Sequence, residues 1–170
     1  MQQACTAPNP ADADALLHSI HQKMQKNYLL VPTHNNAVDA LLQNKFHLAE
    51  TKGCHLLSSL VLKNDLAIDC MDLICILANL LDNAISACGP GDTIQISGVA
   101  QKGLLILEVR NPDHGQKLPK QFQLPHLKAN GHGSGLSSVE HTAEKYGGQL
   151  SLFSRNGIVT ARVTLELQEL

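Results

Sequence analysis

The segment that most constrains the fold is the apolar run of residues 69–88, DCMDLICILANLLDNAISAC. Read at the period of an α-helix, it is apolar on nearly every face, which is typical of a helix buried in a domain core. Polar side chains nevertheless recur along one stripe of this helix, at Asp72, Asn79, Asn83 and Ser86. A buried amide is costly unless it has a hydrogen-bond partner. The two asparagines, one turn apart, are therefore expected to bond either neighbouring backbone or a polar ligand.

Flanking residues mark both ends of this helix. Asp69 is a typical N-cap, and Asp72 at the third helical position adds a weak capping arrangement. Residues 89–92, Gly-Pro-Gly-Asp, form a strong stop signal. Because Asn79 interrupts the run, we expect no membrane-spanning segment here. The start of the chain, residues 1–15, also lacks the basic and apolar regions of a signal peptide.

The rest of the chain reads as an alternation of helices and strands. The expected helices cover residues 11–30, 36–52 and 136–146, and the expected strands cover residues 54–62, 93–99, 104–109, 149–154 and 158–167. Residues 104–109 are largely apolar, which predicts a central strand. Residues 111–131 contain three prolines and form a loop of a length that is usually functional or mobile.

Composition excludes several functions. A net charge of -2 gives no general attraction to nucleic acid or to an anionic membrane. Aromatic residues make up 3% of the chain and tryptophan is missing, so the core is expected to be aliphatic. The five cysteines form no CxxC pair and lie mostly in apolar runs, which indicates buried thiols and a reducing, cytosolic compartment.

A second motif is the glycine box, residues 131–136, GHGSGL, which opens a predicted helix. Glycines let the backbone approach a phosphate, and the free amides of a helix N-terminus favour anions. By itself this string fits a flexible loop before a helix equally well.

Taken together, the two motifs resemble those of the GHKL ATPases, the group that includes gyrase, histidine kinases and MutL. Residues 79–84, NLLDNA, resemble the N box of that family, and residues 133–136, GSGL, its GxGL motif. A hairpin and the long loop separate them, in the order that the family uses, and the resemblance covers about residues 36–167. Residues 36–45 and His132 resemble the branch of quorum-sensing peptide receptors and citrate sensors.

This resemblance implies a fold and a division of the chain. The expected fold class is an α/β two-layer sandwich of the Bergerat type, with a mixed sheet covered by helices on one face. Residues 1–33 would be an N-terminal tail and a linker or dimerisation-type helix, and residues 34–170 the ATP-binding catalytic domain of a sensor histidine kinase.

The resemblance also implies the site. Asn83 would hold Mg²⁺, and Asn79 stands where gyrase-type members carry a glutamate base and would support the phosphates or the metal shell. Asn111 would bond the adenine of ATP. The phosphates would lie on the glycine box, at His132, Gly133, Ser134, Gly135 and Leu136. The long loop would close over the nucleotide.

One departure from the family keeps an alternative open. Most histidine kinases carry a DxGxG motif after the central strand, whereas here Asn111 takes the place of the aspartate and both glycines are missing. An asparagine carbonyl still accepts a proton from the adenine amine, with less charge assistance. A degenerate GHKL domain that acts as a non-enzymatic interaction or phosphotransfer module is the alternative. An anti-sigma-factor serine kinase is disfavoured, because such kinases have a complete DxGxG motif.

None of the histidines has the sequence context expected of the phosphate acceptor. None of the nine is followed by Asp or Glu, as the acceptor histidine of sensor kinases usually is, and His18 and His21 lack a third metal ligand at suitable spacing. The expected partners are therefore a dimerisation and phosphoacceptor helix of the same or a partner kinase chain, a response regulator, and a second copy through the N-terminal helix. The expected location is cytoplasmic.

Overall fold

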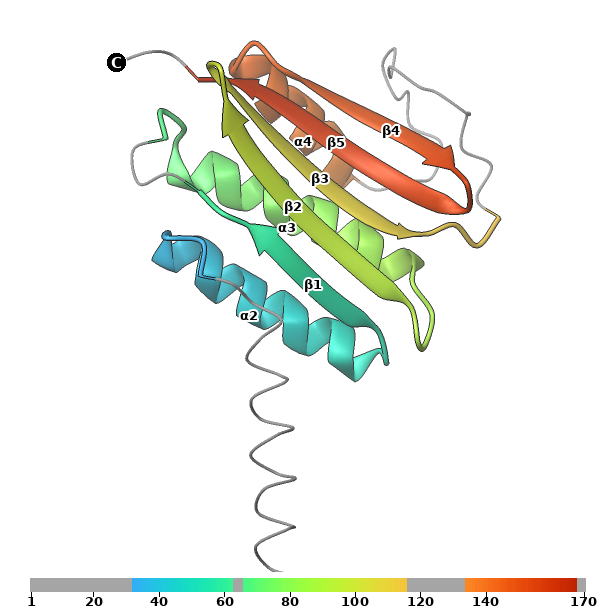
Figure 1. Ribbon diagram of the computed structural model, residues 1–170. Helices are drawn as coiled ribbons and strands as arrows, with labels where there is room; N and C mark the ends of the chain where they lie inside the picture. Colours follow the sequence, from blue (N-terminus) through green and yellow to red (C-terminus); the bar gives the residue numbers. More distant parts are fainter. Residues whose placement is uncertain (1–31, 63–65, 116–133, 168–170) are drawn as a thin grey trace, which may run out of the picture.

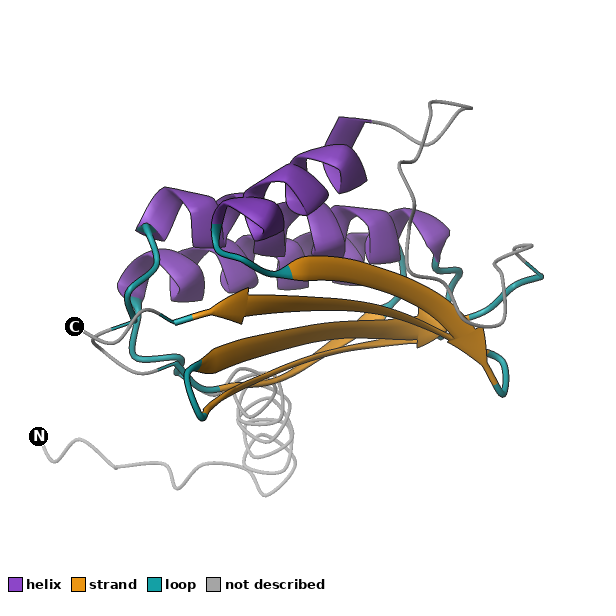
Figure 2. Cartoon of the chain, turned by 90° about the horizontal axis from the view of Figure 1, so that it is seen from above, coloured by secondary structure: helices purple, strands orange, loops and turns teal. Residues whose placement is uncertain are grey.

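The computed structural model describes residues 32–62, 66–115 and 134–167, and these form a five-stranded sheet with three helices on one face (Figure 1 and Figure 2). The predicted two-layer sandwich is confirmed. The predicted helix over residues 11–30 lies outside the described residues. The elements in chain order are α2 (Asn36–Thr51), β1 (His55–Leu60), α3 (Cys70–Ala87), β2 (Thr93–Gln101), β3 (Leu104–Pro112), α4 (Ser134–Lys145), β4 (Gln149–Arg155) and β5 (Ile158–Glu166).

The sheet has the order β1-β2-β3-β5-β4, so β3 is the central strand, as predicted. β1 runs parallel to β2, and the other neighbouring pairs are antiparallel. The β4–β5 hairpin turns at Asn156 and Gly157, whose φ angles of 53° and 75° suit a two-residue loop. β3 continues to Pro112, three residues beyond the predicted end, because Asn111 pairs with Val159 of β5. The predicted loop therefore begins later than expected.

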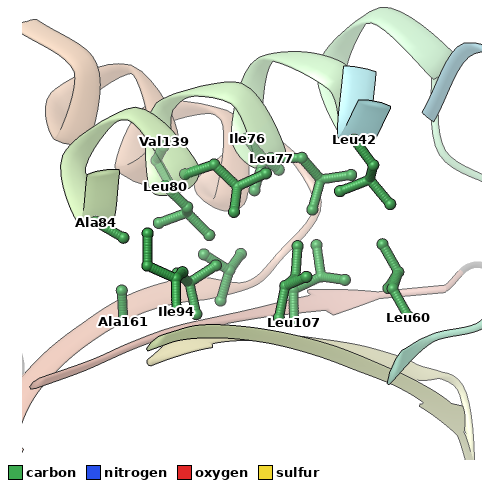
Figure 3. Close-up of a cluster of buried hydrophobic side chains, with 14 of the residues drawn as sticks. Leu42, Leu60, Ile76, Leu77, Leu80, Ala84, Ile94, Leu107, Val139 and Ala161 are labelled. Carbon is green, nitrogen blue, oxygen red and sulfur yellow. The ribbon is translucent and has the colours of Figure 1, made fainter. Parts of the chain in front are cut away.

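The core lies between the helices and the sheet and is aliphatic, as the composition predicted (Figure 3). Alternate residues of each strand face the helices, and α3 lies in the middle of the helical layer. The side chains labelled in Figure 3 are Leu42, Leu60, Ile76, Leu77, Leu80, Ala84, Ile94, Leu107, Val139 and Ala161, and all of them are buried.

α3 is less completely buried than its sequence suggested. Its sheet-facing residues are fully covered, whereas Met71 is 72% exposed. α3 is long and apolar enough to cross a membrane, by length and hydropathy alone. The expectation that no segment meets these two criteria was therefore wrong. Its apolar side instead covers the sheet. Cys54 and Cys88 are buried as expected, but Cys70 is exposed.

α3 begins at the predicted cap, and α2 also begins at a capping side chain. Asp69 accepts hydrogen bonds from the backbone amides of Met71 and Asp72, and Asn35 caps α2 in the same way. Thr33, which we assigned to the N-terminal segment, is fully buried. Its hydroxyl donates to Asp39 in α2 at 2.8 Å, and its carbonyl accepts from the amide of Leu62 after β1. The folded domain therefore includes Thr33.

Candidate functional site

The N box and the glycine box meet where α3 passes the start of α4. A Cβ atom on Gly135 would lie 2.7 Å from Oδ1 of Asn79, so a larger residue here would force the Asn79 side chain to shift. Nδ2 of Asn79 donates to the backbone oxygen of Cys75 at 2.8 Å. Since the NH₂ group is bonded within its own helix, Asn79 presents its carbonyl oxygen to α4. The first backbone amides of an α-helix have no partner inside the helix, so this contact places an acceptor oxygen beside a helix end of the kind that can bind an anion.

Asn83 lies one turn further along α3 on the same stripe. Its side chain is half-buried and makes no hydrogen bond within residues 32–62, 66–115 and 134–167. The sequence left open whether these asparagines bond the core backbone. Asn79 does so through its NH₂ group, and Asn83 does not. Asn83 keeps an amide oxygen for a ligand.

Asn111 lies near the end of β3 and is 4% exposed. Its partner Val159 shares the helix-facing side of the sheet with Ala161, so Asn111 points toward the helical layer. Nδ2 of Asn111 donates to the backbone oxygen of Pro112 at 2.9 Å. As in Asn79, the local bond to the NH₂ group leaves the carbonyl oxygen as the acceptor for an outside donor.

Sequence and structure comparisons fit this arrangement. A sequence model described as GHKL domain matches residues 68–166, more than half of the chain and all of the described N box and Gly135. The chain belongs to the GHKL family. No curated protein matches it.

Several solved structures of histidine kinases have a similar fold. The catalytic domain of histidine kinase ThkA has 21% sequence identity and a TM-score of 0.58, with 76% of this chain and 93% of that chain covered. The histidine kinase AdeS of Acinetobacter baumannii has 15% sequence identity and a TM-score of 0.58, with 96% of this chain and 88% of that chain covered. A histidine kinase of Burkholderia phymatum has 18% sequence identity and a TM-score of 0.60, with 95% of this chain and 87% of that chain covered. At such identities the likeness shows the fold alone.

The remaining members of the predicted site are placed as follows. His132 and Gly133 lie outside the described residues, and Ser134 is the first residue of α4. Leu136 is buried in the hydrophobic core, so its side chain anchors α4 and only its backbone is left for a phosphate.

The donor set of the site fits Mg²⁺. Magnesium takes oxygen ligands, and proteins often supply only one or two of them while substrate phosphates and water supply the others. Asn83 offers such an oxygen, and Asn79 offers a second one turn away. Within the part of the chain that the structure describes, no group of three His, Cys, Asp or Glu side chains could hold a metal ion. A site that relies on amide oxygens and phosphates is therefore the one these residues support.

Two charged contacts of the helices that carry the site were not predicted. Lys45 in α2 is only 8% exposed, and its Nζ lies 2.6 Å from Asp82, the residue before Asn83. The sequence contains a signal for the burial of Lys45, because this residue lies at helical spacing between the buried Leu42 and Ala49. Lysine is rarely buried unless it is paired, and here Asp82 is the partner.

The second contact, here termed the Asp72 cluster, consists of Asp72, Lys145 and Tyr146. Asp72 was expected to be solvated or to cap α3, but its Oδ2 lies 2.5 Å from Nζ of Lys145 and 2.6 Å from the Tyr146 hydroxyl. Hydrogen bonds from Lys145 and Tyr146 hold the pKa of the Asp72 carboxyl below its usual value. Burial, together with the bond to Asp72, raises the pKa of Tyr146. At neutral pH the cluster therefore contains a carboxylate, an ammonium group and a neutral phenol.

Proposed function

We propose that this GHKL domain binds ATP together with Mg²⁺ and serves as the catalytic domain of a sensor histidine kinase. It would supply the γ-phosphate to a histidine on a separate helix. The observation that carries the proposal is the contact of Asn79 Oδ1 with Gly135, because it joins the two boxes at the N-terminus of a helix. The fold shared with histidine kinase catalytic domains supports it.

Each side chain has a role that its geometry allows. Asn83 would hold the metal ion, which neutralises charge on the phosphates when bound. Asn79 is a neutral amide and cannot accept a proton as a glutamate does, so it would hold the phosphates or the metal-bound water. The carbonyl of Asn111 would accept from the adenine amine. The start of α4, with Gly133, Ser134 and Gly135, would face the phosphates with its free amides.

The finer assignments belong to the same proposal. The acceptor histidine would lie on a dimerisation helix of this or a partner chain, and a response regulator would take the phosphate onward. Residues 1–33 would contribute a dimerising helix, with Thr33 packed on the ATPase part. A place in the quorum-sensing receptor branch is supported by the motifs at residues 36–45 and 131–136, and a cytoplasmic location by cysteines that form no CxxC pair.

A non-enzymatic interaction domain is the second candidate, and one observation favours it. An asparagine replaces the adenine-binding aspartate, and it is almost completely buried and bonded to its own neighbour Pro112. If this side chain cannot reach a ligand, adenine would lose its specific contact while the sandwich stays intact.

Calorimetric titration with ATP separates the two candidates. We expect saturable binding in the presence of Mg²⁺ and much weaker binding in EDTA, because the amide oxygens at Asn79 and Asn83 need the metal ion to hold the phosphates. ATP at about a hundredfold excess over Kd should also stabilise the fold by about 2.7 kcal/mol. GTP is the control for adenine recognition through Asn111. Heat signals equal to buffer dilution for both nucleotides at millimolar concentration would support the interaction module instead.

A further inference from the structure

We propose that the Asp72 cluster positions the nucleotide site by fixing α4 on α3, so that Gly135 stays against Asn79. Tyr146 and Lys145 would be positioning residues, which act on the ligand through the placement of the α4 N-terminus. The proposal rests on the proposed function of nucleotide binding and adds to it a part of the molecule remote from the two boxes.

The cluster joins the beginning of α3 to the end of α4. The Tyr146 hydroxyl donates to Oδ2 of Asp72 at 2.6 Å and accepts from the backbone amide of Asp69 at 3.0 Å. Lys145 contacts the same carboxylate oxygen at 2.5 Å. Asp69 is itself the N-cap of α3. The end of α4 is thus attached to the first turn of α3 through both a side chain and the backbone.

The site lies at the opposite end of the same helix pair. Gly135 is the second residue of α4 and Lys145 the last, so about 15 Å of helix separates them at 1.5 Å per residue. Asn79 lies about two turns beyond Asp72 on α3, and the two helices run antiparallel. Two contacts at opposite ends of a helix fix its position along its own axis as well as its rotation.

The contact at Gly135 tolerates little displacement. A Cβ atom at this position would be only 2.7 Å from Asn79 Oδ1. A slide of α4 combined with a rotation would bring the Cβ atom of Leu136 toward that oxygen, because neighbouring side chains of a helix point about 100° apart. The amides at the start of α4 and the carbonyl of Asn79 therefore face a common ligand only in the register that the Asp72 cluster sets.

Stability alone does not account for the cluster. The Lys145 side chain is 60% exposed and that of Asp72 is 24% exposed, and exposed ion pairs add little to stability. α4 is held on the core by Leu136, Val139 and Ala143, all of which are buried. Loss of the cluster should leave α4 packed on the core but able to shift, so binding should suffer more than folding.

The test uses Tyr146→Phe, which removes only the hydroxyl group, in the full chain. We expect the Kd for a non-hydrolysable ATP analogue with Mg²⁺ to rise about tenfold, equal to ~1.4 kcal/mol. Lys145→Arg keeps the charge and should bind like the wild type. Glu108→Gln is the matched control, because Glu108 contacts Arg110 and Arg162 at 2.5 Å on the sheet face turned away from the helices. It should lower the melting temperature at least as much as Tyr146→Phe does, with Kd unchanged.

Amide NMR signals give a readout that needs no nucleotide. The signals of the Gly135 backbone amide and the Asn79 side chain should shift in Tyr146→Phe and stay in place in Glu108→Gln. A wild type that fails to bind the analogue would overturn the proposed function, while the NMR shifts would still decide whether the cluster positions α4. If Tyr146→Phe leaves both Kd and these signals unchanged, the positioning proposal is wrong.

Discussion

Replacing Asn83 with alanine is expected to remove magnesium-dependent nucleotide binding and to leave the melting temperature nearly unchanged. The side chain bonds nothing within the described residues, so its truncation strands no buried partner. It does remove an amide oxygen, a hard ligand suited to Mg²⁺. Loss of groups that merely support a metal ligand costs about 10–100-fold in affinity, and loss of a ligand should cost at least as much. In EDTA the variant and the wild type should bind ATP equally weakly.

Thermal shift and titration on the same samples distinguish this result from a structural role. Ser86→Ala is the matched control, since Ser86 lies on the same stripe, three residues further along α3, and is exposed. If Asn83 were a core amide, its truncation would cost about 1–3 kcal/mol and the melting temperature would fall without any effect of nucleotide. That outcome would remove Asn83 from the site.

Gly148→Ala should produce the largest loss of stability of any alanine substitution considered for this chain. Gly148 connects α4 to β4, and a Cβ atom there would lie 1.7 Å from the backbone oxygen of Thr164 in β5. Its own amide is bonded to Ala143 at 2.9 Å, which holds it in place. The backbone on both sides of Gly148 cannot move aside as a flexible side chain can. We expect a loss of about 3 kcal/mol or more, seen as a fall in melting temperature of about 10 °C.

Urea denaturation of Gly148→Ala beside Gly89→Ala tests this reasoning. Gly89 also follows a helix, but the nearest atom to a Cβ there is a side-chain oxygen of Asp92 at 3.8 Å, an ordinary contact. Gly89→Ala should therefore change the unfolding free energy by less than about 1 kcal/mol. Equal midpoints for the two variants would show that the β4–β5 backbone can move apart at little cost.

Local signals predicted most of the fold. α3 was recognised by its apolar residues and its Asp69 cap, and the β4–β5 hairpin by the Asn-Gly turn, because these features depend on neighbours in sequence. The end of β3 was missed since Pro112 and the polar residues after it resemble a loop. Pairing with β5, some 48 residues later for Asn111 and Val159, overrides that local preference.

The site was predictable only in part, for the same reason. The N box and the glycine box have sequence patterns, and their order placed them together. The Asp72 cluster joins residues 73 and 74 positions apart, and nothing in the spacing of Asp72 pointed to Tyr146. The orientation of the asparagine amides could not be inferred either, because it depends on hydrogen bonds to Cys75 and Pro112 that form only in the folded chain.

The nine-residue pairing of β3 with β5 has a consequence for how this domain can diverge. β3 and β5 are held side by side by their own hydrogen bonds, although the segment between Asp113 and Ser134 separates them in sequence. The sheet therefore does not need that segment to join the two strands. The entropy of closing a loop grows only with the logarithm of its length, about 0.6 kcal/mol per doubling. We expect that removing half of residues 116–133 would change the unfolding free energy in urea by about that much, and a loss of several kcal/mol would refute this. Evolution can therefore lengthen, shorten or rewrite this stretch to suit a new signal or partner, while the fold around it persists.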